Sequence, residues 1–403
     1  MRRTKSIAAA AGIALIAAAC ASGAGTEPDT TAPTSTTATT TPAAVQSASN
    51  LPTGVSALDD RFDPSFPEPL IDPSEVLSGG PPPDGIPPID DPQFVDVAAA
   101  DAWLNDPEPV LVVQVGDDVR AYPIQILMWH EIVNDTVGGE PLAVTYCPLC
   151  NSAITFRRVV RGVEVTFGTS GNLYNANLVM YDRATESLWN QLDGRAVIGL
   201  LTGEELERLP SVMISWADVK ATHPDAKVLD RDRTGYRRNY GTNPYTGLDD
   251  PNGQPFLFRG DVDVRAKAMQ RIVAIENGKA AVAWALDAIS GDGPTVTPGA
   301  FAGDPLVIFW EPGQSSALDT SDIADGRDVG NVGVFSPVVD GQELTFRVDD
   351  AGFVDDQTGS RWDIFGEATS GPLSGTRLVP ITFVRTFWFS WAAFRPDTDL
   401  IEA

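Results

Sequence analysis

Cysteine and histidine are scarce in this sequence, which has three cysteines and two histidines among 403 residues. So few histidines give little support to a Ser–His–Asp triad, and the chain has no G-x-S-x-G, P-loop or Rossmann glycine pattern. Positive charge is also scarce, with 28 Lys and Arg against 55 Asp and Glu and a net charge of −27. A polyanion of this size repels nucleic acid, so we expect no nucleic-acid partner.

Long apolar runs are absent apart from residues 7–19, which follow three basic residues. This run is shorter than the roughly 20 residues that a membrane-spanning helix needs, and its flanks are typical of a signal peptide. It ends in small residues followed by Cys20. We therefore expect a lipoprotein signal peptide at 1–19 and lipidation of Cys20. The alternative is an ordinary secreted protein in which Cys20 is incidental.

Residues 20–50 are rich in Thr, Ala and Pro, with almost no large apolar side chain. Such a segment cannot bury enough surface to fold, so we expect a disordered tether, although a glycosylated stalk is compatible with the same composition. Residues 51–93 are rich in Pro and Gly and predict an extended arm. Together these features predict an extracytoplasmic protein whose partner is the membrane, reached through its lipid anchor.

An internal repeat is the strongest sign of organisation in the folded part. Residues 116–122 are echoed by 278–284, and residues 141–146 by 305–310, in the same order along the chain. The sequence therefore predicts a first half at 94–254 and a degenerate second half at 255–403, related by internal duplication.

Each half is predicted to be mainly β with few short helices, an α+β fold. Alternating apolar residues indicate a hairpin of strands at 110–115 and 119–122. The sequence predicts helices at 124–133, at 211–221 and, in the second half, at 388–394. Of the two histidines, His223 precedes a proline at the expected end of a helix, where a structural role fits.

The motif Cys147-Pro148-Leu149-Cys150 is the densest chemical feature, and the second half has neither thiol in the corresponding segment. In an oxidising compartment a C-x-x-C pair can be a redox centre, a metal site or an inert disulfide. The residues after Cys150 are typical of a strand rather than of the helix whose N-terminus lowers a thiol pKa in thioredoxin-type sites. We therefore expect no thioredoxin fold.

His130 is the nearest candidate to assist the thiols, either as a third metal ligand or as the base that forms a thiolate. The alternative is a histidine that is simply hydrogen-bonded at a helix end. A metal bound by Cys147, Cys150 and His130 would need a further ligand, such as Glu131, Asp135 or water. The residues expected to line a ligand cleft are Glu131, Asn151, Asn172, Tyr174 and Asn175.

Several motifs together resemble the domain-of-unknown-function 3179 (DUF3179) family of bacterial and archaeal proteins. They lie at residues 129–135, 145–152, 178–183 and 187–189, with the arm at 79–87. The resemblance implies no established activity or substrate. Some members of the family are described as selenoproteins, and selenocysteine in place of a motif cysteine would imply redox or soft-metal chemistry rather than an inert bridge. The family's motif residues correspond to Cys147, Cys150 and His130.

The leading hypothesis from the sequence is an exported, lipid-anchored protein in which Cys147 and Cys150 carry out thiol–disulfide redox chemistry. A copper or zinc site at the same residues is the first alternative. A non-enzymatic surface binding module with a structural disulfide is the second. The sequence leaves the redox partner or small ligand open.

Overall fold

Strands dominate the structure, a computed structural model that describes residues 50–402. The expected signal peptide at 1–19, Cys20 and nearly all of the expected tether lie outside the described residues. The prediction of a mainly β fold with few short helices is confirmed. Within residues 50–402 none of the helices is long and apolar enough to span a bilayer. The α helices of this part are α1 Val97–Ala100, α2 Ile124–His130, α3 Trp216–Thr222, α4 Leu286–Ile289 and α5 Trp388–Phe394.

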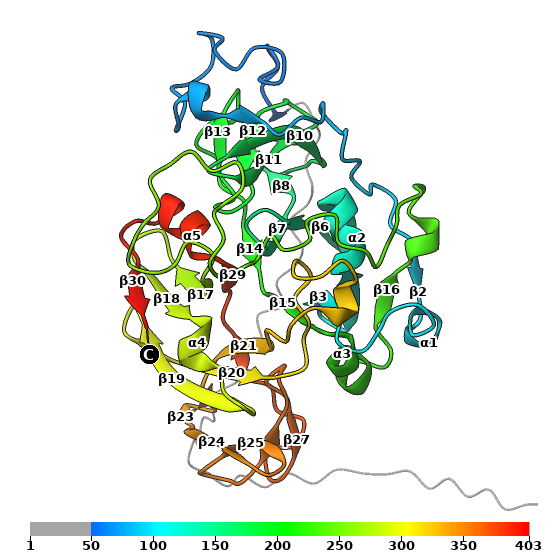
Figure 1. Ribbon diagram of the computed structural model, residues 1–403, viewed down its shortest axis with the longest axis vertical. Helices are drawn as coiled ribbons and strands as arrows, with labels where there is room; N and C mark the ends of the chain where they lie inside the picture. The colour runs from blue at the N-terminus through cyan, green and yellow to red at the C-terminus, as the bar shows by residue number, and fades with distance from the viewer. Residues whose placement is uncertain (1–49, 403) are drawn as a thin grey trace, which may run out of the picture. The chain divides into compact units, whose positions relative to one another are not determined.

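The first half contains three sheets and a two-stranded ribbon (Figure 1). One sheet has the order β15-β3-β4-β16-β2, with strands Ser211–Ser215, Pro109–Val115, Asp118–Pro123, Lys227–Leu229 and Phe94–Val95. The next has the order β14-β7-β6-β5, with strands Arg208–Leu209, Ser152–Arg157, Glu140–Cys147 and Ile132–Val137. The third has the order β1-β10-β11-β12-β13, with strands Leu77–Ser78, Phe167–Tyr174, Asn177–Asp182, Leu188–Asn190 and Ala196–Ile198. The ribbon pairs β8 Val159–Val160 with β9 Val163–Glu164.

The second half also has three sheets and a ribbon. The order β29-β17-β18-β30 joins Val384–Phe387, Arg271–Glu276, Ala281–Ala285 and Asp399–Ile401. The order β19-β20-β21-β28 joins Thr295–Phe301, Asp304–Glu311, Asn331–Ser336 and Val379–Pro380. The order β24-β25-β26-β27 joins Phe346–Asp349, Gly352–Asp355, Arg361–Trp362 and Ala368–Ser370. The ribbon pairs β22 Val338–Val339 with β23 Gln342–Glu343.

The turns after β11 and β25 are built in the same way. Asp182 accepts hydrogen bonds from the backbone N–H of Thr185 (2.6 Å) and from the indole of Trp189 (3.0 Å). Asp355 accepts the corresponding bonds from the residues three and seven positions further on, at 2.6 and 3.1 Å. In both turns one buried carboxylate accepts hydrogen bonds from N–H groups three and seven positions further on. The same spacing of side chains therefore fixes the geometry of both turns.

The two halves pack crosswise, with β29 beside β7 and β15 beside β21. The carbonyl oxygen of Cys150 accepts hydrogen bonds from Thr386 Oγ1 (2.7 Å) and from the backbone N–H of Phe387 (3.1 Å). One large apolar core includes both cysteines and the second-half side chains Phe387, Trp388 and Trp391. The thiol loop is therefore covered by the second half.

Residues 234–270 lead from the last strand of the first half to β17 and are called here the segment between the halves. They are held by a buried ion-pair cluster. Asp249 is fully buried, and its carboxylate contacts Arg271 Nη2 (2.5 Å) and Arg327 Nη2 (2.8 Å) and accepts a hydrogen bond from Ser316 Oγ. A buried carboxylate is tolerated only when such partners compensate its lost hydration. These contacts fix the segment that carries Tyr245 on one side and Phe256 on the other.

The local predictions held best where periodicity and turn residues agree. The hairpin expected at 110–122 is confirmed as β3 and β4, and the helix expected at 388–394 is α5. The helix expected at 124–133 ends at 130, because the next residue adopts a left-handed conformation and the chain then enters β5. The helix expected at 211–221 was wrong in its first turn, since residues 211–215 pair with β3 and the helix begins at 216.

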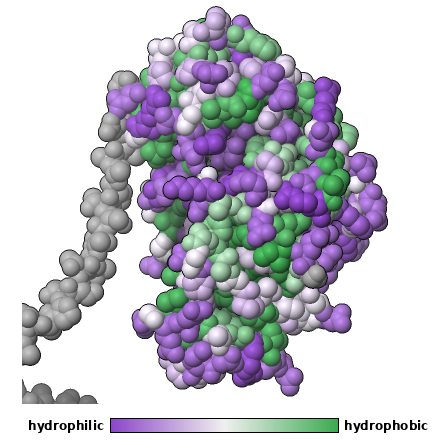
Figure 2. All heavy atoms as spheres, turned by 90° about the vertical axis from the view of Figure 1, so that its left-hand side faces the viewer, coloured by the Kyte–Doolittle hydropathy of each residue, from purple (hydrophilic) through white to green (hydrophobic). Residues whose placement is uncertain are grey.

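The surface is mostly hydrophilic on the face shown in Figure 2, with hydrophobic side chains in separate groups among polar ones. This agrees with the excess of acidic residues. The arm at 51–93 consists of turns, bends and irregular backbone, with the short 3-10 helix Pro73–Glu75, strand β1, which pairs with the edge of β10, and a bridge from Ile89 to Val133. Two further 3-10 helices occur at Arg231–Arg233 and Ile323–Asp325.

Candidate functional site

The cysteine motif forms the loop of a β-hairpin between β6 and β7, in which Cys147 pairs with Ser152. Asn151 closes the loop in a left-handed conformation (φ 54°), which asparagine tolerates better than most residues. Its side-chain oxygen accepts a hydrogen bond from Tyr146 Oη at 3.2 Å. The expectation that a strand follows Cys150 is confirmed, so the residues directly after the loop do not place a helix N-terminus at the thiols.

Both thiols are free and buried, with exposed fractions of 1% for Cys147 and 0% for Cys150. Cys150 Sγ lies 3.1 Å from Ser152 Oγ and accepts a hydrogen bond from Asn177 Nδ2, also at 3.1 Å. Cys147 Sγ makes a long contact of 3.9 Å to the carbonyl oxygen of Ala176 and a hydrogen bond to Cys150. The two sulfurs are therefore in unequal surroundings, since polar donors gather on Cys150.

Gln191 is hydrogen-bonded to both Ser152 and Asn177 and so fixes the positions of these two donors to Cys150. Its Oε1 accepts hydrogen bonds from Ser152 Oγ (2.8 Å) and Asn177 Nδ2 (2.9 Å), and its Nε2 donates to Thr145 Oγ1 (3.0 Å). The Ser152 hydroxyl has a single hydrogen, with Gln191 Oε1 and the sulfur of Cys150 both within reach. Rotation of this hydroxyl lets it donate to the sulfur when Cys150 is ionised.

The pKa values of the two thiols shift in opposite directions, down for Cys150 and up for Cys147. Burial alone raises the pKa of Cys150, but hydrogen bonds from Cys147, Ser152, Asn177 and Ser390 outweigh burial and lower it to about 7. Burial raises the pKa of Cys147 well above its usual range, and its hydrogen bond to Cys150 and the neighbouring charges raise it further. When the pair loses its first proton, near neutral pH, the remaining proton therefore stays on Cys147 and the negative charge lies on Cys150.

Glu131 is a carboxyl group held at the same site. It follows α2 in a left-handed conformation (φ 58°), which is unfavourable for glutamate and is fixed by hydrogen bonds from its N–H to Leu127 and from Tyr146 to its carbonyl. Its side chain is 7% exposed. Burial, and then the charge of Cys150, raises the pKa of Glu131 to about 8. Glu131 is therefore mostly protonated at neutral pH.

A cavity of about 130 Å³ adjoins this group, with Cys147 and Glu131 in its wall. The arm covers it with Gly79, Pro81 and Ile86, and the segment between the halves contributes Tyr245, Phe256 and Leu257. Phe256 and Leu257 are exposed, at 55% and 38%, and Leu257 has a positive φ of 57°. Cys147 is thus the thiol that faces open space, while Cys150 lies behind it.

His130 makes other contacts. Its Nδ1 lies 2.7 Å from the carbonyl oxygen of Pro87 and donates to it, so its Nε2 accepts from Tyr240 Oη, also at 2.7 Å. Burial lowers the pKa of His130 to about 4, which keeps the ring neutral. Both ring nitrogens are occupied by the arm and by the segment at 234–240. These contacts favour the alternative of a hydrogen-bonded structural histidine over a third ligand or a base for the thiols.

The other expected site residues separate into two groups. Glu131 and Asn172 line the cavity beside Cys147. Tyr174 packs edge-on against Phe394 (5.7 Å between ring centroids), Asn175 occupies a left-handed turn, and Asn151 closes the thiol loop. Within residues 50–402 no group of three or more His, Cys, Asp and Glu side chains is arranged to hold a metal ion. A closed zinc site needs four ligands, and this part of the chain does not bring together the donors that it would need beyond two thiols.

Sequence reasoning missed the residues that surround Cys150, which are Ser152, Asn177, Gln191, Thr386 and Ser390. Ser390 carries a buried hydroxyl, and its interaction with Cys150 lowers the pKa of that thiol. The density of amides between residues 168 and 177 was the only available signal, and it pointed to Asn172 and Asn175 rather than to Asn177.

Replacing Asn177 by alanine tests the origin of the low pKa of Cys150. Loss of the Nδ2 donor should raise that pKa from about 7 toward its usual value, because the thiolate loses a charge-assisted hydrogen bond. The thiolate ultraviolet absorbance, titrated against pH, measures this shift, and Cys150→Ser identifies the responsible sulfur. Asn172→Ala, a neighbouring asparagine in the wall of the thiol cavity, is the matched control. An unchanged titration in Asn177→Ala would contradict the assignment.

Replacing Glu131 by glutamine should make stability less dependent on pH. The pKa of Glu131 in the folded chain is raised to about 8, whereas in the unfolded chain it is about 4.5. Between these pH values the carboxyl ionises only in the unfolded chain, so the stability that is present below about pH 4.5 is lost as the pH rises toward 8. The free energy of unfolding of Glu131→Gln should therefore rise relative to wild type between pH 5 and 8, by at most about 1.4 kcal/mol per pH unit. Urea unfolding at several pH values measures the difference. Glu68→Gln, at an exposed position, is the control for removal of a carboxyl group. A difference that does not change with pH for Glu131→Gln would refute a buried, protonated carboxyl.

Comparison with known proteins places this site within a family. A search of curated proteins and a search of solved structures each found no match. A family model described as "Protein of unknown function (DUF3179)" matches residues 83–398, which include the thiol loop, Glu131, the surrounding amides and β29 with α5. Because the match covers most of the chain, the resemblance drawn from the sequence motifs is confirmed, and the protein belongs to the DUF3179 family.

Proposed function

We propose that Cys147 and Cys150 form a redox-active dithiol that exchanges with a disulfide substrate, with Glu131 as the proton donor and acceptor. The observation that carries this proposal is the unequal treatment of the two sulfurs. Cys150 is surrounded by hydrogen-bond donors that favour its thiolate, while Cys147 faces the cavity beside a carboxyl group. An inert disulfide would not need a buried, protonated glutamate next to it.

The reduction of a substrate disulfide balances with the groups present. Cys147 passes its proton to the Cys150 thiolate and attacks one substrate sulfur, forming a mixed disulfide. The leaving thiolate takes the proton of Glu131. Cys150 then attacks Cys147, the intramolecular S–S bond forms, and the proton from Cys150 goes to the second leaving thiolate by way of the Glu131 carboxylate. Two electrons and two protons have passed to the substrate, and one negative charge has moved from Cys150 to Glu131.

The cavity limits what can reach Cys147. Its wall is mainly apolar, with Ile86, Leu149, Leu173 and Leu178 beside the thiol. The exposed side chains of Phe256 and Leu257 form part of its cover and can move without loss of buried core. A small disulfide, or a disulfide on an extended segment of another chain, fits this approach better than one buried in a folded partner.

Thiol trapping across a series of redox buffers measures the potential of the pair. We expect a value above about −300 mV, since structural disulfides in exported proteins lie below it. With glutathione disulfide as substrate, Cys150→Ser should accumulate a mixed disulfide on Cys147, seen by intact mass. Cys147→Ser should form none, because Cys150 lies behind the cavity wall. A potential below that limit, or a mixed disulfide only on Cys150, would overturn the proposal.

We also propose that the protein is exported and anchored to the membrane through Cys20. The sequence supports this through the signal-like residues 1–19 and the small residues before the cysteine. Expression in a bacterial host with a labelled fatty acid should label the wild-type chain and leave it in the membrane fraction. Cys20→Ala should lose the label, and a labelled Cys20→Ala protein would exclude this anchor.

We further propose that the two halves arose by duplication. Support comes from the sheets, since β3-β4, β5-β6-β7 and β10 to β13 have counterparts in the same order in β17-β18, β19-β20-β21 and β24 to β27. The matching turns at Asp182 and Asp355 add to it. Superposition of the halves should bring these two carboxylates together, and a superposition that separates them would count against a common origin.

A further inference from the structure

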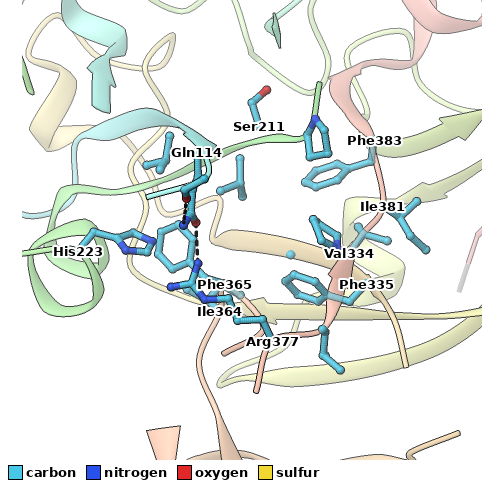
Figure 3. Close-up of a pocket in the computed structure, with 17 residues that line it drawn as sticks. Gln114, Ser211, His223, Val334, Phe335, Ile364, Phe365, Arg377, Ile381 and Phe383 are labelled. Atoms are coloured by element: carbon cyan, nitrogen blue, oxygen red, sulfur yellow. Dashed lines mark hydrogen bonds between the residues drawn. The ribbon is translucent and has the colours of Figure 1, made fainter. Parts of the chain in front are cut away.

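A second cavity, of about 350 Å³, lies between the halves and shares no lining residue with the thiol cavity. Its first-half wall comes from β3 and β15, and its second-half wall from β21 and from the loops on either side of β28. Its volume is within the range of small-molecule sites, roughly 300–1,000 Å³. Figure 3 shows the residues that line it.

The body of this cavity is apolar. Val212 and Val112 face it from the first half, and Val334, Phe335, Ile381 and Phe383 from the second. In Figure 3 Phe335, Ile381 and Phe383 lie together on one side. An apolar ligand group placed there would be removed from water on several sides, which is favourable in proportion to the area buried.

The other side of the cavity is polar, and Gln114, His223 and Arg377 gather there (Figure 3). Arg377 donates to Gln114 Oε1 (2.8 Å) through Nη1, while its Nε and Nη2 face Glu367 at 2.7 and 2.5 Å. The His223 ring packs edge-on against Phe365 (4.5 Å between centroids), and among residues 50–402 no hydrogen bond engages its nitrogens. On the polar side the imidazole ring of His223 therefore offers one N–H donor and one nitrogen acceptor to a ligand.

The local charge of this polar side is close to zero. The positive charge of Arg377 is offset by Glu367, and Gln114 is uncharged. Burial, and then the charge of Arg377, lowers the pKa of His223, so its ring is neutral at physiological pH. The chain as a whole carries −27, which disfavours an anion at long range, and the guanidinium disfavours a cation at short range.

We infer that this cavity binds an amphipathic small molecule with an apolar body and an uncharged hydrogen-bonding head, such as a hydroxyl or a carbonyl. The body lies between the valines of β3 and β15 and the aromatic side chains of the second half. The head lies at His223 and Arg377, where the ring and the free N–H groups of the guanidinium satisfy it. The inference is independent of the thiol chemistry, since no residue of one site enters the other.

Three ligands with one body and different heads test this assignment by calorimetry on the full chain. The probes are 1-octanol, octanoate and octylammonium. We expect octanol to bind with a dissociation constant below about 1 mM, and at least about threefold more tightly than either charged probe. The half-buried Ile381→Trp should fill the cavity and abolish binding of all three, with an unchanged circular dichroism spectrum as evidence of folding.

Two charge variants test whether Arg377 and Glu367 select the ligand head group, because a purely structural role would not change the selectivity between the probes. Arg377→Gln leaves Glu367 unpaired and should shift selectivity about three- to fivefold toward octylammonium. Glu367→Gln leaves Arg377 unpaired and should shift it by a similar factor toward octanoate. Arg347→Gln, another partly exposed, ion-paired arginine of the second half, is the control and should shift nothing. Absence of octanol binding, equal binding of all three probes, or no opposite shift in the two variants would overturn the inference.

Discussion

The two hydrogen bonds on the carbonyl oxygen of Cys150 are the contact on which the thiol site depends. Thr386 Oγ1 and the Phe387 N–H reach this oxygen from a strand more than two hundred residues further along the chain. The same strand runs directly into α5, whose Ser390 lies against the sulfur. Because one backbone group of the loop is fixed from the second half, the loop is held in place and its thiols are shut off from water.

Burial then determines the chemistry of the site, and it acts differently on each group. Loss of hydration raises the pKa of Cys147 and of Glu131, which keeps both protonated. For Cys150 the same loss is outweighed by nearby donors, chiefly on Ser152 and Asn177. Two protonated groups and one thiolate are thus held close together, and these are the groups that the proposed dithiol exchange would use.

The second half lacks thiols, yet both candidate sites depend on it. It supplies β29 and Ser390 to the thiol loop, and it supplies Phe335, Ile381 and Arg377 to the cavity between the halves. Arg385 also joins the halves, since it is buried and donates to the carbonyl oxygen of Met213 and to Gln314 Oε1. The second half therefore forms part of the wall of the thiol site in the first half, rather than a separate module.

By itself the sequence determined the class of fold, the family, several local elements and the identity of the two thiols. The hairpin of β3 and β4, α5 and the strand after Cys150 follow from apolar periodicity and turn residues, which are encoded within a few positions. Tertiary structure alone decided which partners act. In the folded chain His130 is hydrogen-bonded to Pro87 and Tyr240, and Glu131 lines the same cavity as Cys147. Asn177 and Thr386 donate hydrogen bonds to Cys150. These contacts join distant segments through single side chains, and hydrogen bonding between such segments leaves no periodic pattern in the chain.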